Sequence, residues 1–79
     1  KTHNPFAVND AYLAFALGVD SDEVNPYGSS LVYGHPQAPT GLRGIVELLY
    51  ALRARGGGVG LFTGCAAGDT GAAVVVRVD

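Results

Sequence analysis

The sequence predicts an α/β fold, a layered sheet with helices that ends in an antiparallel strand pair. Three observations support this class: an amphipathic helical pattern over residues 40–55, two β-favouring apolar runs at 59–63 and 72–78, and a small-residue connection between those runs. The chain has 79 residues, of which 48% are hydrophobic and 15% charged, and no low-complexity tract divides it. We therefore expect one compact domain over residues 1–79.

The first half of the chain predicts a helix, a connection and a strand. Residues 9–17 (NDAYLAFAL) contain helix formers after an Asn-Asp pair that can cap the helix, and Gly18 can adopt the left-handed conformation that ends one. Residues 21–27 are acidic and contain Asn-Pro, which is typical of a connection. Residues 29–33 (SSLVY) favour β structure and precede a Gly-His-Pro turn, so we expect a short strand there.

Residues 40–55 (TGLRGIVELLYALRAR) give the clearest helical signal. Apolar residues recur at steps of three and four, with Thr40 as a plausible N-cap and Gly56 as a stop. The apolar positions are Leu42, Ile45, Val46, Leu49 and Leu52. Leu48 and Tyr50 widen the apolar surface, so we expect this helix to be covered on more than one side.

The last third predicts the strand pair. Residues 63–71 (TGCAAGDTG) can make a tight connection between the runs at 59–63 and 72–78. The second run is nearly continuously apolar and β-branched, which is typical of a strand covered on both faces. Two helices in so short a chain do not supply that cover, so we expect it from another segment or another chain.

Composition excludes several classes of function. The five Lys and Arg residues form no basic stripe, which argues against nucleic acid as a partner. No apolar stretch approaches the roughly 20 residues of a membrane span, and we expect neither a membrane segment nor a signal peptide. Cys65 cannot form an internal disulfide and lacks zinc-site spacing with His3 and His35, so we expect neither a disulfide nor a structural metal ion.

A lone free Cys fits a reducing compartment, and we expect a cytoplasmic protein. The absence of Met suggests a piece of a larger protein.

Two side chains could carry chemistry. His35 lies at a connection beside Pro36, which restricts its backbone, although a loop His is often only a surface residue. Cys65 is surrounded by small residues that let a ligand approach, which suits a thiol acting as acid or base, but a free Cys is commonly just a small buried hydrophobe. Asp69 could raise the pKa of this thiol if the two came close. The run RGGGVG (55–60) lacks the spacing of a phosphate loop, and Asn9 could simply cap a helix.

The blocks VNDAY, GHPQAPTG and GCAAGD, in this order, resemble the C-terminal catalytic half of the thiolase family. In the family pattern, residues 9–12 correspond to Asn-Glu-Ala-Phe and 25–29 to Asn-x-x-Gly-Gly. Residues 34–41 correspond to Gly-His-Pro-x-Gly-x-Ser/Thr-Gly, and 65–69 to Cys-x-Gly-Gly-Gly. The resemblance covers essentially the whole chain and implies the C-terminal half of a thiolase-like fold.

The resemblance implies thiolysis of a 3-ketoacyl-CoA or the reverse Claisen condensation, with the coenzyme A thioester as substrate and no resident cofactor. His35 would activate a nucleophilic Cys from the absent N-terminal half, and its ring N–H would help to hold the thioester oxyanion. Cys65 would remove or return the α-proton. Asn9 would position a water at the oxyanion site, and the turn at Ala67 and Gly68 would keep a backbone donor there.

The sequence also departs from the family pattern. Ala38, Ala67 and Asp69 stand where the family has glycines, which suggests a divergent subgroup. The implied partners are the N-terminal half of the same protein, an acyl-CoA substrate and further copies in a homodimer or homotetramer. Two alternatives stay open: a non-catalytic acyl-CoA-binding or scaffolding subunit, and a retro-aldol lyase acting on a hydroxyacyl-CoA.

Overall fold

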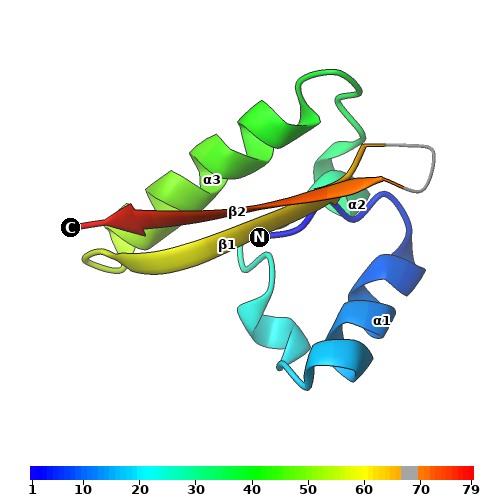
Figure 1. Cartoon of the computed structure of the whole chain (residues 1–79), viewed down its shortest axis with the longest axis horizontal. Helices are drawn as coiled ribbons and strands as arrows, with labels where there is room; N and C mark the ends of the chain where they lie inside the picture. Colours follow the sequence, from blue (N-terminus) through cyan, green and yellow to red (C-terminus); the bar gives the residue numbers. More distant parts are fainter. Residues whose placement is uncertain (67–69) are drawn as a thin grey trace.

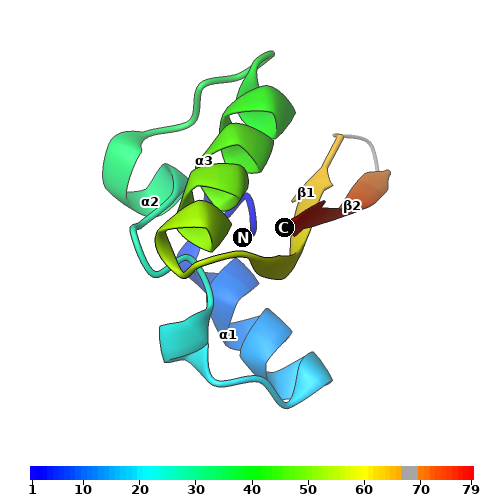
Figure 2. The same cartoon turned by 90° about the vertical axis from the view of Figure 1, so that its left-hand side faces the viewer.

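The computed structural model describes residues 1–66 and 70–79 and has the predicted α/β class with a final antiparallel pair (Figure 1). Its elements are α1 (Ala7–Leu17), the 3-10 turn η1 (Ser21–Glu23), α2 (Ser30–Tyr33), α3 (Thr40–Ala54), β1 (Gly58–Cys65) and β2 (Gly71–Val78). Helix α3 packs along β1 and β2, whereas α1 contacts η1 and lies apart from α3 (Figure 2). No helix in the described ranges is long and apolar enough to cross a membrane.

Both long helices form where their local signals predict them. Helix α1 begins two residues before the predicted start, and Asn9 caps it from inside the first turn, because its Oδ1 accepts from Phe6 N at 3.1 Å. Gly18 ends this helix in the left-handed region, at φ 64°, and its N–H donates to Ala14 O. Helix α3 covers residues 40–54 of the predicted 40–55, and Gly56 follows it with φ 89°. The predicted N-cap is wrong, because Thr40 is the first helical residue and Pro39 is the N-cap.

The strand predicted at residues 29–33 is wrong, because this segment forms the helical turn α2. Its backbone groups are satisfied locally: the carbonyl of Ser29 accepts from Val32 N and Tyr33 N, both at 2.9 Å. The N–H of Leu31 donates to Asn4 Oδ1 at 3.2 Å. Intrinsic β preference is weak and depends on a neighbouring strand. In the described part of the chain the sheet consists of β1 and β2, which offer α2 no such partner.

The predicted strand pair is confirmed and is longer than expected. Strands β1 and β2 pair antiparallel from Gly58 opposite Val78 to Cys65 opposite Gly71. The N-terminal segment joins the other edge of β1 through a parallel bridge between Thr2 and Thr63. There the N–H of His3 donates to Thr63 O at 2.9 Å. This bridge places His3 beside the end of β1 that carries Cys65.

The buried core is small and lies between α3 and the sheet. Leu48 and Leu52 of α3 pack with Phe62 of β1, and Ile45, Val76 and Val78 flank them. Gly60 permits this close packing, since a Cβ there would lie 2.6 Å from Leu48 Cδ1. On β2, Val75 points away from the core and is 69% exposed, so this chain covers one face of the strand. The cover expected for the other face stays a prediction.

Candidate active site

The structure brings His35 and Cys65 into one cavity. His35 lies in the loop between α2 and α3, and Cys65 is the last residue of β1. Both side chains line a cavity of about 450 Å³. The other residues that line it are His3, Gln37, Ala38, Thr40, Gly41, Phe62, Gly64, Ala66 and Ala72. Cys65 is exposed, so it is not the small buried hydrophobe that was the alternative explanation for it.

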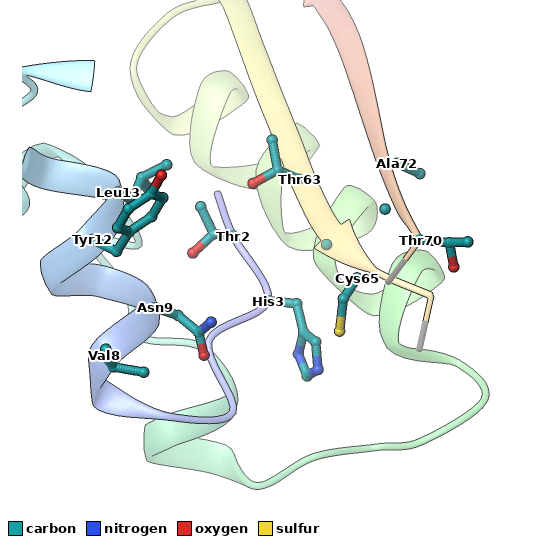
Figure 3. Close-up of a pocket in the computed structure, with 12 residues that line it drawn as sticks. Thr2, His3, Val8, Asn9, Tyr12, Leu13, Thr63, Cys65, Thr70 and Ala72 are labelled. Atoms are coloured by element: carbon teal, nitrogen blue, oxygen red, sulfur yellow. The ribbon is translucent and has the colours of Figure 1, made fainter. Parts of the chain in front are cut away.

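A second cavity, of about 670 Å³, opens between α1 and the hairpin (Figure 3). Asn9, Tyr12 and Leu13 line it from α1, and Thr63 and Cys65 line it from β1. The two cavities share His3, Gly64, Cys65 and Ala72. Asn9 therefore reaches the same space as Cys65, but it does not line the cavity that holds His35, and its Oδ1 is engaged by Phe6 N.

The hydrogen bonds of His35 define its neutral tautomer. Its Nδ1 accepts from the backbone N–H of Gln37 at 3.0 Å and lies 3.3 Å from Thr40 Oγ1. The Thr40 hydroxyl itself donates to Gln37 O at 2.6 Å, which fixes this turn at the start of α3. Since Nδ1 accepts a hydrogen bond from the backbone N–H of Gln37, the neutral ring carries its own proton on Nε2. In this neutral tautomer, the second ring nitrogen of His35 is an N–H donor and not an acceptor.

His3 is a site residue that the sequence analysis did not identify. Its ring centroid lies 4.3 Å from that of His35, with the ring planes tilted by 56°. The residue is only 7% exposed, and it lines both cavities. Its Nδ1 lies 2.6 Å from Ser30 Oγ, while its buried Nε2 has no partner among the described residues. Figure 3 draws its ring and the side chain of Cys65 among the residues that line the larger cavity.

The surroundings keep His3 neutral. Burial lowers the pKa of His3 first, and the positive charges of His35 and Arg43 lower it further. A neutral imidazole has one N–H donor and one acceptor nitrogen, so this residue can donate a hydrogen bond without bringing a charge into the site. No local sequence signal marks it, since Thr-His-Asn before a helix is typical of a loop and its position depends on the bridge to β1.

Three of the predicted site residues lie outside the part of the chain that the structure describes. Ala67, Gly68 and Asp69 fall outside the described residues. The backbone donor expected at Ala67 and Gly68, and the effect expected of Asp69 on the Cys65 thiol, therefore stay predictions. In residues 1–66 and 70–79, no group of three or more His, Cys, Asp or Glu side chains is arranged to hold a metal ion.

Comparison with known proteins identifies the family. Residues 1–78 match the family described as the thiolase C-terminal domain. A 3-ketoacyl-CoA thiolase of Photorhabdus laumondii is 51% identical over 75 residues, which cover 94% of this chain and 17% of that protein. 3-Ketoacyl-CoA thiolases of Serratia proteamaculans and Erwinia tasmaniensis are 54% and 57% identical over 65 residues, covering 81% of this chain and 15% of theirs. The chain therefore spans less than a fifth of these relatives, and no solved structure gives a significant match.

Proposed function

Because the chain belongs to the thiolase family through its C-terminal domain, we propose that it supplies the acid–base and oxyanion-binding part of a 3-ketoacyl-CoA thiolase. One observation carries the proposal: His35 and Cys65, from a loop and a strand end, line the same cavity. The names of the relatives support the substrate class. The nucleophilic cysteine comes, on this proposal, from the N-terminal part of the same protein, and assembly as a homodimer or homotetramer stays a prediction.

Thiolysis assigns a proton transfer to Cys65. A cysteine thiolate from the remainder of the protein attacks the 3-keto carbon, and the bond between C2 and C3 breaks. The acyl group stays on that cysteine as a thioester, while the electron pair left on C2 takes a proton from the Cys65 thiol. The products of this step are the acyl-enzyme and acetyl-CoA. The thiol of a second coenzyme A then attacks the acyl-enzyme, and its proton restores the Cys65 thiol.

The tautomer of His35 favours one of its two expected roles. With Nδ1 engaged by Gln37 N, the Nε2–H is suited to donate to an oxyanion or to the nucleophilic thiolate. To act as a base through Nε2, the ring must lose the hydrogen bond from Gln37 N to Nδ1 and move its proton from Nε2 to Nδ1. We therefore assign His35 first to hydrogen-bond donation.

His3 completes the donor pair on this proposal. It contacts His35, and its buried Nε2 has no partner in residues 1–66 and 70–79, whereas Asn9 uses its Oδ1 to cap α1. Two ring N–H groups held by the fold are a preorganised oxyanion site that needs no ordered water. The role expected for Asn9 remains a competing prediction.

The test is coenzyme A-dependent cleavage of acetoacetyl-CoA and longer 3-ketoacyl-CoAs by the full-length protein. We expect turnover in the wild type and its loss in His35→Ala and Cys65→Ser, by at least ~10²-fold for each. Arg77→Ala is the control, because this side chain is 75% exposed and pairs only with Asp79 in the described residues. It should keep wild-type turnover.

Other outcomes would replace the proposal. A protein that binds coenzyme A but cleaves no 3-ketoacyl-CoA of any length would be a non-catalytic subunit. Cleavage of a hydroxyacyl-CoA to an aldehyde, without added coenzyme A, would indicate a retro-aldol lyase. Full thiolysis by Cys65→Ser would remove Cys65 from the proton transfer.

A further inference from the structure

Ser30 connects the site to a charged residue behind it. Its Oγ lies 2.6 Å from Nδ1 of His3 and accepts a longer hydrogen bond, 3.4 Å, from Nη2 of Arg43. Ser30 is only 6% exposed, so water does not compete for its hydroxyl. Arg43 is in turn paired with Glu47 one turn further along α3, at 3.6 Å. These contacts come from α2 and α3 and meet on the side of His3 that faces away from its unpartnered Nε2.

The direction of these hydrogen bonds follows from the donors present. A guanidinium has only donors, so Arg43 donates to the Ser30 oxygen. The Ser30 hydroxyl keeps one proton to donate, and in the described residues its only other partner is Nδ1 of His3. If Nδ1 carried a proton, it would donate as well, and the buried Ser30 hydroxyl would lose its acceptor, which is costly. Both hydrogen bonds of the Ser30 hydroxyl are therefore satisfied when Arg43 donates to the Ser30 oxygen and the Ser30 hydroxyl donates to Nδ1 of His3.

We propose that Ser30, oriented by Arg43, is a positioning residue that holds His3 in the neutral tautomer with its proton on Nε2. The buried Nε2, which has no partner among the described residues, is then an N–H donor on a residue that lines the cavity shared by His35 and Cys65. The lowered pKa of His3 agrees with a neutral ring. The use of this donor for a thioester oxygen rests on the proposed thiolase function, but the tautomer itself does not.

The experiment measures the tautomer directly in the substrate-free, full-length protein labelled with ¹⁵N-histidine. The His3 signals are assigned by their loss in His3→Gln. We expect the wild-type proton on Nε2, a mixture of tautomers in Ser30→Ala, and recovery of the Nε2–H form in Ser30→Thr, which restores the hydroxyl. In the turnover assay, kcat should fall by ~10- to 100-fold in Ser30→Ala, the loss typical when a group that orients a metal-ligating histidine is removed, and recover in Ser30→Thr.

Ser29→Ala is the matched control. Ser29 is the adjacent buried serine, and its Oγ donates to Thr2 O at 2.7 Å and not to His3. Its loss should lower stability as much as Ser30→Ala while leaving the tautomer unchanged. A wild-type proton on Nδ1, or a tautomer unaffected by Ser30→Ala, would overturn the proposal. A wild type with the Nε2–H tautomer but no thiolysis would leave the Ser30 assignment intact and defeat the proposed function instead.

Discussion

At the scale of single residues, contact with a second imidazole disfavours a positive charge on His3. His3 and His35 lie with ring centroids 4.3 Å apart, and the Arg43 guanidinium approaches from the other side through Ser30. Protonation of His3 would place a buried positive charge near the Arg43 guanidinium and near His35, which can itself become positively charged. The lowered pKa of His3 favours an uncharged N–H donor at this position, and acid should weaken both the site and the fold.

The lowered pKa of His3 predicts how stability depends on pH. The unfolded residue has the ordinary pKa of 6.5, and the folded one a lower value. Between these two values the unfolded state binds more protons than the folded state, so the free energy of unfolding rises with pH. The stability gained in this way is complete once the pH exceeds the unfolded pKa of 6.5. Urea unfolding of the full-length protein from pH 5 to 8 should show this component, and His3→Gln should remove it. Parallel pH profiles for wild type and variant would contradict the prediction.

Asn9 and His3 can be separated by their effects on activity and stability. Asn9→Ala removes the acceptor for Phe6 N, which should cost about 0.5–2 kcal/mol of stability and leave turnover within about tenfold of wild type. His3→Gln should lower turnover by ~10²- to 10³-fold, the usual cost of an oxyanion donor. Thiolysis rates and urea unfolding of both variants measure the two effects. A turnover loss for Asn9→Ala as large as that for His3→Gln would return the oxyanion role to Asn9.

At the scale of elements, the sequence-based prediction succeeds where the determinants are local. The stop at Gly18 and the helix formers before it predict α1, although Asn9 lies inside its first turn and Phe6 is the N-cap, and apolar periodicity predicts α3. Helix α2 was mistaken for a strand because it has four residues, and a side chain from elsewhere, Asn4, binds its backbone. His3 was missed because it reaches the site through pairing with β1, about 60 residues along the chain. Such long-range pairing leaves no pattern in a short window of sequence.

Close packing of α3 on β1 predicts opposite effects for two glycines in the same helix. A Cβ at Gly44 would lie 2.7 Å from Phe62 Cδ2 and closer still to Cε2, whereas a Cβ at Gly41 meets nothing within 4 Å. Alanine is the better helix former at both positions, by roughly 1 kcal/mol. Overpacking against the buried Phe62 costs about 1–3 kcal/mol, so Gly44→Ala should destabilise the protein. Gly41→Ala should be neutral or stabilising.

Urea unfolding of both variants measures this difference in the full-length protein. The double variant Gly44→Ala with Phe62→Leu tests the cause, since a smaller side chain removes the clash although it leaves a less filled core. The second substitution should cost less in the Gly44→Ala background than in the wild type. Equal stability of Gly44→Ala and Gly41→Ala would mean that α3 does not approach β1 as closely as described.

At the scale of the whole molecule, the hairpin has one covered and one open face. Val76 and Val78 pack toward α3, while Val75 projects from the opposite face of β2 beside its cross-strand partner Leu61. Val75 is 69% exposed and Leu61 43% exposed. A continuous β-branched run is typical of strands with both faces buried, and this chain spans 15–17% of the three relatives compared. We therefore predict that the remainder of the protein covers the outer face.

Val75→Asp in the full-length protein tests this cover. If the face is buried there, an unpaired carboxylate should destabilise the protein by several kcal/mol, seen as a lowered unfolding midpoint, loss of assembly on size exclusion, or both. Val75→Thr is the control, because it keeps the β-branched shape of the strand residue without adding a charge, and its loss should be much smaller. An unfolding midpoint for Val75→Asp equal to that of wild type, with an unchanged elution volume, would show that the outer face of the hairpin stays open to water in the whole protein. The hairpin would then be covered on its inner face alone, where α3 already buries Phe62.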